Sequence, residues 1–172
     1  MTGNDPIEDA LFAGLDPGEN DAPVLLEQYK LFVGTSEALV QRRQGVNTFF
    51  LSANSLLVAG AGLILRGGAS SHMESVILVL LSAIGLGLAF VWRRLIHSFR
   101  QLSAGKFDVI HALERRLPAR AFAAEWKALG EGEDPKVYRP FTRTESMTPI
   151  VFAVLHLTLL AASVWTWTNG AN

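Results

Sequence analysis

Three long hydrophobic stretches, separated by polar segments, dominate the pattern of this chain. They cover residues 48–65, 75–92 and 148–168 and contain no Lys, Arg, Asp or Glu. An α-helix of about 18 to 20 residues rises about 27 to 30 Å, which is enough to cross the hydrocarbon core of a bilayer. The alternative, three buried helices of a soluble protein, is disfavoured because so small a domain could not hide them. The pattern therefore predicts an all-α membrane protein with three transmembrane helices.

A short segment joins the first two hydrophobic stretches. Residues 66–74 begin with Arg66-Gly67-Gly68 and are rich in Gly, Ala and Ser. Such a segment is long enough only for a turn. The first two spans are therefore expected to form an antiparallel hairpin.

Apolar residues also recur at three- and four-residue steps on both sides of this hairpin, in residues 23–47 and from residue 93 to Leu117. We expect two amphipathic helices that extend the hairpin on one side of the membrane and pack antiparallel to each other. Only Gly45 interrupts the first series, so this helix can join the first span in one long rod. The apolar positions are Leu25, Leu26, Tyr29, Phe32, Val33, Leu39 and Val40 in the first series, and Leu95, Ile96, Phe99, Leu102, Phe107, Ile110, Leu113 and Leu117 in the second.

The remaining segments are shorter. Residues 1–22 combine Gly and Pro with acidic side chains, which predicts a disordered acidic tail. Within residues 93–147, Pro118 ends the long amphipathic helix, and a short helix is expected over residues 119–129 with Gly130 as its stop. Thr142 and Glu145 have the spacing of a capping box that would begin the third helix. Residues 169–172 complete the chain.

The basic residues are distributed unevenly about the three spans. Three Lys and Arg precede the first span and eleven lie in residues 93–147, against one, Arg66, in residues 66–74 and none after residue 168. By the positive-inside rule, the N-terminus and residues 93–147 are expected in the cytoplasm, and the 66–74 turn and the C-terminus on the outer side. The arginines beside the spans are predicted membrane-face anchors, either as plain stop-transfer charges or as ligands of anionic lipid headgroups, which are favoured over nucleic acid as partners. They are Arg42, Arg43, Arg93 and Arg94.

The residues around both membrane exits resemble a known family. They are Gln41-Arg42-Arg43, Asn47, Phe49-Phe50 and Asn54, followed by Trp92, Leu95-Ile96, Ser98-Phe99-Arg100, Leu102, Lys106-Phe107, Ile110, Glu114, Leu117-Pro118, Phe122 and Glu125-Trp126. This series resembles the RipA family of octameric bacterial membrane proteins, from about Glu27 to the third span. The resemblance implies a homo-oligomer, an octamer, in the bacterial inner membrane, in a family associated with bacterial growth inside host cells. It implies no enzymatic activity, so it assigns no catalytic residue. The chain departs from the family pattern at Phe99, where an aromatic hydroxyl is frequent, and at Ser103, where Asn is common.

Polar side chains within the spans are the main candidates for a functional site. His156 falls near the middle of the third span, where an ionisable side chain is costly. It is interpreted either as a pH sensor or part of a polar passage, or as a neutral imidazole bonded to a backbone carbonyl or to a hydroxyl such as Ser55, Ser82 or Thr158. Asn47 and Asn54 lie one heptad apart and so share one helix face. They are interpreted either as packing residues between helices or as the lining of a lumen.

Small residues at four-residue spacing indicate close contact between helices, in the hairpin or between subunits. Ala83 and Gly87 provide such a surface on the second span, together with Gly85 and Ala89, and Gly60 does so with Gly62 on the first.

No segment carries a catalytic signature. The chain has no Cys, the remaining histidines lack metal-ligand spacing, and the acidic residues near Glu131 lack the ordered ligand series of a calcium loop. We therefore expect a protein that is not an enzyme and that has no cofactor and no metal.

Two functions remain open. One is a homo-oligomeric scaffold or regulator that meets an unidentified protein partner at the cytoplasmic face of the membrane. The other is a pore or channel-like assembly, an alternative also suggested by a weaker likeness to the small membrane effectors of nucleotide-signalled antiphage systems, although no sensor module is visible.

Overall fold

The structure is a computed structural model of the whole chain, and it describes residues 5–14, 22–67, 72–134, 136–138 and 145–169. Within these residues it contains helices and no strands. The helices are α1 (Pro6–Phe12), α2 (Ala22–Arg66), α3 (His72–Glu114), α4 (Ala121–Ala128), the 3-10 helix η1 (Gly130–Gly132) and α6 (Thr148–Asn169). Three of them, α2, α3 and α6, are long and apolar enough to cross a membrane, as the sequence predicts.

The chain divides into two compact units. Unit 1 comprises Met1–Arg42 and Phe99–Pro140, and unit 2 comprises Arg43–Ser98 and Phe141–Asn172. Helices α2 and α3 each contribute to both units, and Gly45 does not interrupt α2. The predicted joining of each amphipathic segment with its span is therefore confirmed for both helices.

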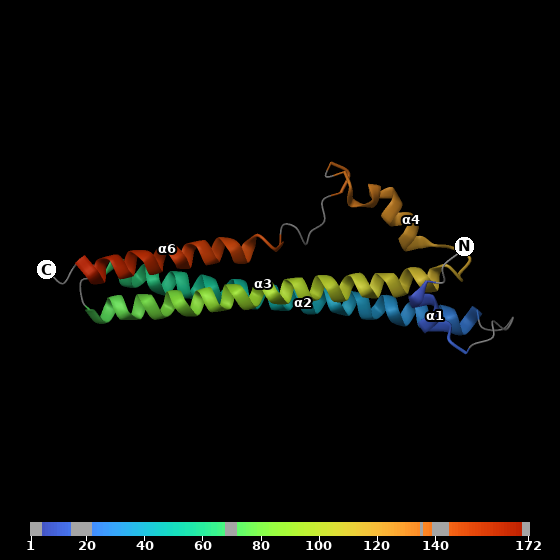
Figure 1. Cartoon of the computed structure of the whole chain (residues 1–172), viewed down its shortest axis with the longest axis horizontal. Coiled ribbons are helices and arrows are strands. Elements are labelled where there is room, and N and C mark those ends of the chain that lie inside the picture. The colour runs from blue at the N-terminus through green and yellow to red at the C-terminus, as the bar shows by residue number, and fades with distance from the viewer. Residues whose placement is uncertain (1–4, 15–21, 68–71, 135, 139–144, 170–172) are drawn as a thin grey trace. The chain divides into compact units, whose positions relative to one another are not determined.

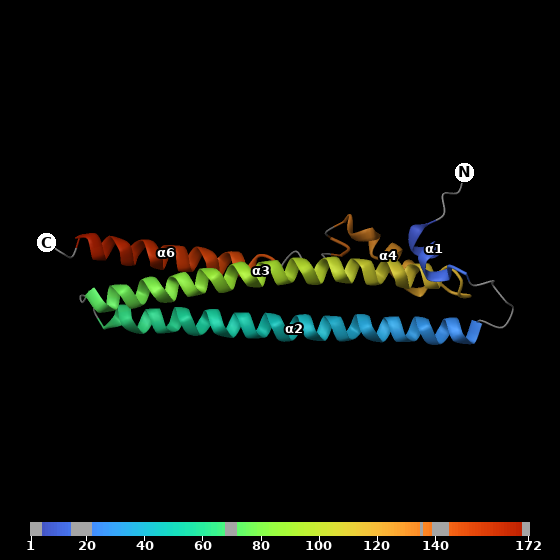
Figure 2. The same ribbon diagram turned by 60° about the horizontal axis from the view of Figure 1, so that its bottom comes forward.

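Unit 2 holds the three membrane-spanning segments. Its parts of α2 and α3 run antiparallel, and α6 lies alongside them with its C-terminal end at the same end as the α2–α3 turn (Figures 1 and 2). At that end the rings of His72 and Trp167 pack edge to face at 4.9 Å. Near the opposite end, Phe50 of α2 stacks on Trp92 of α3 with ring centroids 5.9 Å apart, and Phe152 of α6 packs against the same Trp92. Aromatic contacts thus tie all three spans together.

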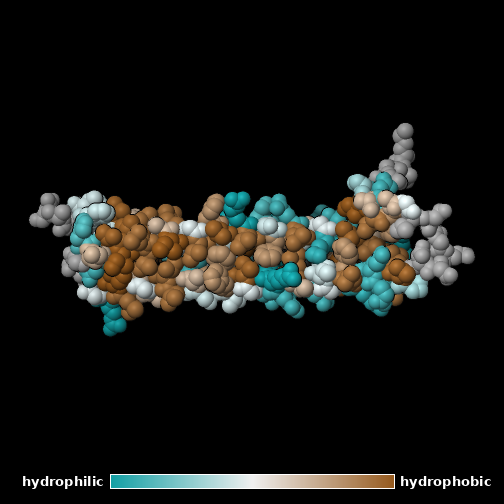
Figure 3. Space-filling model, turned by 90° about the horizontal axis from the view of Figure 1, so that it is seen from below, coloured by the Kyte–Doolittle hydropathy of each residue, from teal (hydrophilic) through white to brown (hydrophobic). Residues whose placement is uncertain are grey.

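The outer surface of unit 2 is strongly apolar. Large hydrophobic side chains are exposed on each span, among them Leu56 (75 %), Phe90 (63 %) and Val151 (56 %). Figure 3 shows a face on which hydrophobic residues cover most of the spans. Such a surface is unfavourable in water and is what a lipid-facing helix requires.

Unit 1 is built around the antiparallel parts of α2 and α3 that lie outside the spans, with α4 and α1 packed beside them. Its buried side chains include Leu39, Ile110 and Leu113. Glu114, the last residue of α3, is 1 % exposed. Its Oε1 accepts hydrogen bonds from the Tyr29 hydroxyl (2.9 Å) and the Phe122 N–H (2.9 Å), and its Oε2 accepts one from the Ala123 N–H (3.2 Å).

These bonds explain where α4 begins. The first N–H groups of a helix have no partner within it, and Arg120, the residue before α4, provides no side-chain cap. Glu114 supplies the missing acceptor from another helix. Burial raises the pKa of Tyr29 to about 12, and the hydrogen bond to Glu114 and the charge of its carboxylate add to the effect.

The predicted disordered tail over residues 1–22 is wrong for part of its length. Asp5 caps α1 by accepting a hydrogen bond from the Ile7 N–H at 3.0 Å, and Pro6 occupies the first turn, where its missing N–H costs nothing. Ala22 already belongs to α2. Residues 1–4 and 15–21 lie outside the described residues.

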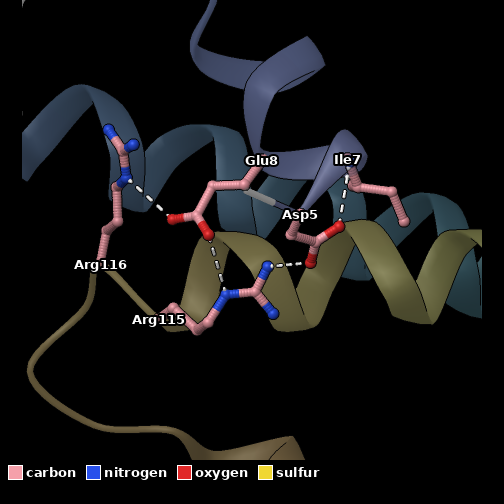
Figure 4. Close-up of polar contacts among 5 residues, drawn as sticks. All are labelled: Asp5, Ile7, Glu8, Arg115 and Arg116. Atoms are coloured by element: carbon pink, nitrogen blue, oxygen red, sulfur yellow. Dashed lines mark hydrogen bonds and ion pairs between the residues drawn. The ribbon is translucent and has the colours of Figure 1, made fainter. Parts of the chain in front are cut away.

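Contacts with the end of α3 hold α1 in place. Asp5 pairs with Arg115 at 2.6 Å, and Glu8 bridges Arg115 and Arg116 (Figure 4). The Arg116 guanidinium lies 3.3 Å from the centre of the Phe12 ring. A helix of seven residues is marginal by itself. Its order therefore depends on these partners, far away in the sequence.

Candidate functional site

A polar pair from two different helices lies buried inside unit 2. Asn54 of α2 is 0 % exposed and His156 of α6 is 1 % exposed. The Asn54 Oδ1 and the His156 Nε2 are 3.2 Å apart, and the Asn54 Nδ2 donates to the Phe50 carbonyl at 2.9 Å. Two of the predicted polar positions, 102 residues apart, are thus brought together.

These hydrogen bonds indicate which nitrogen of the His156 imidazole carries the proton. Because the Asn54 amide nitrogen is used within α2, its oxygen faces His156 and accepts a hydrogen bond. The Nε2 therefore carries the proton, and the neutral ring presents Nδ1 as an acceptor. A neutral imidazole with an amide partner avoids placing a charge within the span.

Gly85 of α3 forms the floor beneath the imidazole. A Cβ at this position would overlap the Cε1, Nε2 and Nδ1 atoms of His156. Only glycine lets the backbone of α3 approach the ring so closely. The spacing of small residues predicts Gly85 on a helix-contact surface, but nothing in that pattern indicates that the ring opposite is His156.

Two buried polar atoms near this pair have no hydrogen-bond partner. They are the His156 Nδ1, an acceptor, and the Oγ of Ser82, a hydroxyl that can donate. Ser82 is fully buried and lies one turn before Gly85 on α3. Ser82 is one of the hydroxyls that the sequence offers as a partner for His156, but the partner in the structure is Asn54, which the sequence did not indicate.

A second network lies between the helices where α6 begins. The Asn47 Nδ2 donates to the Glu145 carboxylate, and the Asn47 Oδ1 accepts from the Trp92 indole N–H at 2.8 Å. Arg43 faces the same carboxylate at 3.6 Å, with its side chain 15 % exposed. Asn47 of α2 thus joins Trp92 of α3 to the buried carboxylate of Glu145, which lies just before α6.

This network changes the interpretation of Arg43 and Glu145. Arg43, predicted as a membrane-face anchor, is largely buried and ion-paired, whereas Arg42, Arg93 and Arg94 are exposed, as an anchor role requires. Thr142, the first member of the predicted capping box, lies outside the described residues. Glu145 itself is committed to Asn47 and Arg43.

The small residues divide between inward and outward positions. Ala61, Gly85 and Ala89 are the buried ones within unit 2. Ala83 and Gly87 are exposed, and a Cβ at Gly60 or Gly87 would meet no atom within 4 Å. Within the single chain these three residues therefore make no close helix contact, and their role between subunits stays a prediction.

The geometry suits helix association better than chemistry. Among the residues that the structure describes, no three His, Asp or Glu side chains gather where they could hold a metal ion. The polar side chains of the spans bond mainly to one another and to backbone carbonyls, and they orient α2, α3 and α6.

Comparisons with known proteins give one match. No curated protein and no solved structure matches the chain. One family model does match, over residues 26–165, and its description is the octameric membrane protein family (8xMP). The match includes all three spans except the last residues of α6, together with α4. The chain belongs to the octameric membrane protein family.

Proposed function

We propose that the protein is a non-enzymatic homo-oligomer, an octamer, that acts as a scaffold or regulator at the cytoplasmic face of the bacterial inner membrane. The observation that supports it most is the contrast between the two units. Within the spans of unit 2, Asn54 and His156 turn inward and pair within the chain, whereas in unit 1 large apolar side chains remain exposed.

The exposed apolar side chains lie on the parts of α2 and α3 outside the spans. Val24 is 57 % exposed, Leu31 67 % and Leu102 53 %. Single exposed apolar residues are common, but helices with apolar side chains on more than one face usually have a partner on each. Neighbouring copies of the chain can cover these faces, consistent with the family description. The orientation with both termini of the hairpin in the cytoplasm rests on the distribution of Lys and Arg.

A pore is less well supported. A polar passage along the subunit axis needs polar side chains on the outer face of a span, where neighbouring subunits would meet around a lumen. Asn54 and His156, the strongest candidates, are buried within the single chain. The resemblance to the RipA family extends the scaffold proposal to a role in bacterial growth inside host cells.

The test pairs an assembly measurement with a flux measurement. The protein in lipid nanodiscs should have the mass of an octamer, and Leu102→Lys should weaken the assembly. Each buried Leu contributes about 1.5 to 3 kcal/mol, so each interface should weaken at least tenfold. Gln101→Lys is the matched control, because it adds the same charge at the neighbouring exposed position.

The same preparation in liposomes should pass no ions or small solutes. An assembly unaffected by Leu102→Lys would count against oligomerisation through unit 1. Steady ion flux through the wild-type protein would refute the scaffold proposal and support the pore.

A further inference from the structure

Unit 1 contains a cavity of about 570 Å³ between α3 and α4. On α3 its wall consists of Ala104, Phe107, Asp108 and His111, which follow one another at three- and four-residue steps and so share one helix face. The volume lies within the range of small-molecule sites, about 300 to 1,000 Å³. Ala104 leaves room on the α3 side because its side chain is short.

The α4 side of the cavity has the same spacing. Phe122, Glu125, Trp126 and Leu129 lie on one face of this helix, and Tyr138 closes the wall from the segment that follows η1. α3 thus contributes Phe107 and one carboxylate to this space, and α4 contributes two aromatic rings and one carboxylate.

Two aromatic pairs form the walls. Phe107 and Phe122 meet edge to face with centroids 5.8 Å apart, and Trp126 and Tyr138 do so at 6.5 Å. Four aromatic side chains therefore line the same space. A cation over the face of an aromatic ring is attracted by the ring quadrupole.

The two carboxylates of the cavity are exposed and available. Asp108 and Glu125 each stand next to an aromatic wall residue in the sequence. Within the part of the chain that the structure describes, neither forms an ion pair, and the nearby Arg115 and Arg116 are ion-paired with Asp5 and Glu8. The cavity therefore combines apolar walls with two carboxylates that have no ion-pair partner among the described residues, and with the imidazole of His111.

The cavity is fixed in the fold by Glu114. This carboxylate accepts hydrogen bonds from the N–H groups of Phe122 and Ala123 in α4 and from the Tyr29 hydroxyl. It therefore sets where α4 begins relative to α3. The Phe122 ring also packs at 6.3 Å from Tyr29. One aromatic wall is thus anchored on its far side, as a preformed site requires.

We propose that this cavity binds a small organic cation, an ammonium group that carries apolar substituents. The rings contact the substituents and the face of the cation, and Asp108 and Glu125 neutralise its charge. An anion would meet two like charges, and an uncharged apolar molecule would leave both carboxylates unused. A metal ion would gain nothing from four aromatic rings. This site goes beyond the scaffold function and does not depend on it.

The experiment uses the full chain in nanodiscs made of phosphatidylethanolamine and phosphatidylglycerol, so that no lipid carries a quaternary ammonium headgroup. The probes are choline and its uncharged carbon isostere, 3,3-dimethylbutan-1-ol. Calorimetry should show saturable binding of choline, and binding of the isostere should be at least tenfold weaker. Trp126→Leu, which keeps an apolar side chain and removes the ring, should weaken choline binding at least tenfold.

The charge is tested with the double variant Asp108→Asn/Glu125→Gln. Choline binding should weaken at least tenfold, while binding of the isostere stays unchanged. Glu133→Gln is the matched control, because it removes an exposed carboxylate of unit 1 outside the cavity and should leave choline binding unchanged.

Three results would overturn the proposal. They are the absence of saturable choline binding, equal affinity for the two probes, and choline binding that the charge variant does not change. If the charge variant disrupts the oligomer while the wild type ignores choline, the occupant is a basic side chain of a neighbouring copy.

Discussion

Replacing Glu114 with Gln should lower the pKa of Tyr29 and loosen the start of α4. The carboxylate accepts three hydrogen bonds, from the Tyr29 hydroxyl, the Phe122 N–H and the Ala123 N–H. Gln keeps one acceptor oxygen, but it replaces Oε2 with an NH₂ group, which cannot accept the hydrogen bond from the Ala123 N–H. Hydrogen bonds to a charged group contribute about 1.5 to 3 kcal/mol each. Losing one and weakening two should cost about 2 to 4 kcal/mol.

The ionisation of Tyr29 gives a readout specific to this contact. The chain has two Tyr, so a Tyr138→Phe background leaves Tyr29 as the only one. With a pKa of about 12, Tyr29 should be about one-tenth tyrosinate at pH of about 11. In Glu114→Gln the fraction should rise several-fold. It should stay below about nine-tenths, the value for an ordinary pKa of about 10, because burial, the largest cause of the shift, remains.

The sign of the pH dependence follows from the same pKa. A pKa raised in the folded protein means that the unfolded chain loses its proton first. The stabilisation is therefore fully present below pH of about 10 and is lost as pH rises through about 12. Two pKa units correspond to about 2.7 kcal/mol, and solvent screening of a half-buried hydroxyl reduces this to about 1 to 2 kcal/mol.

The measurement is tyrosinate absorbance after rapid mixing to high pH, together with hydrogen exchange of the α4 amides at neutral pH. Glu37→Gln is the control, since Glu37 is exposed on the same helix as Tyr29. An unchanged tyrosinate fraction in Glu114→Gln would refute the contact. Unchanged exchange of α4 would refute its role as the cap.

Three further substitutions test unit 2, each by the free energy of unfolding in nanodiscs. Gly85→Ala should cost about 1 to 3 kcal/mol because the new methyl group overlaps the imidazole, whereas Gly87→Ala, with open space around it, should change stability by less than about 1 kcal/mol; equal effects would contradict the packing. Asn54→Leu should cost about 1 to 3 kcal/mol by leaving the imidazole N–H buried and unpaired, and a neutral result would show that another acceptor replaces it. Glu145→Ala should cost about 3 kcal/mol by leaving Arg43 buried and unpaired; adding Arg43→Met should recover part of the loss, and strict additivity of the two would argue against the pair.

The helices were predictable because they depend on local pattern. Hydropathy located the spans, and the recurrence of residues such as Phe107, Ile110 and Leu113 extended α3 well beyond Arg94. α1 was missed although Asp5-Pro6 is a local start signal. The Gly and Pro around it favoured disorder, and its stability comes from Arg115 and Arg116, which lie about 110 residues further along the chain.

The partners within the site were not predictable in the same way. Sequence marked Asn54 and His156 as polar groups in apolar spans, but the rotation of α2 and α6 about their axes decides which groups meet. Likewise, the sequence does not distinguish Arg43 from Arg42, because both are basic residues beside the first span. Only the folded chain brings Glu145 close to Arg43, where the two side chains form an ion pair.

The imidazole of His156 also has a consequence for biogenesis. The described hydroxyls of α6 that form hydrogen bonds do so with carbonyls of the same helix, as with Thr158 to Val154 and Ser163 to Leu159. They are satisfied as soon as α6 becomes helical. His156 instead needs Asn54, so a third span that enters the bilayer alone exposes an imidazole to lipid at a cost of a few kcal/mol, on the order of the penalties for polar groups there. Stable insertion of the third span is therefore coupled to a hairpin that is already in place.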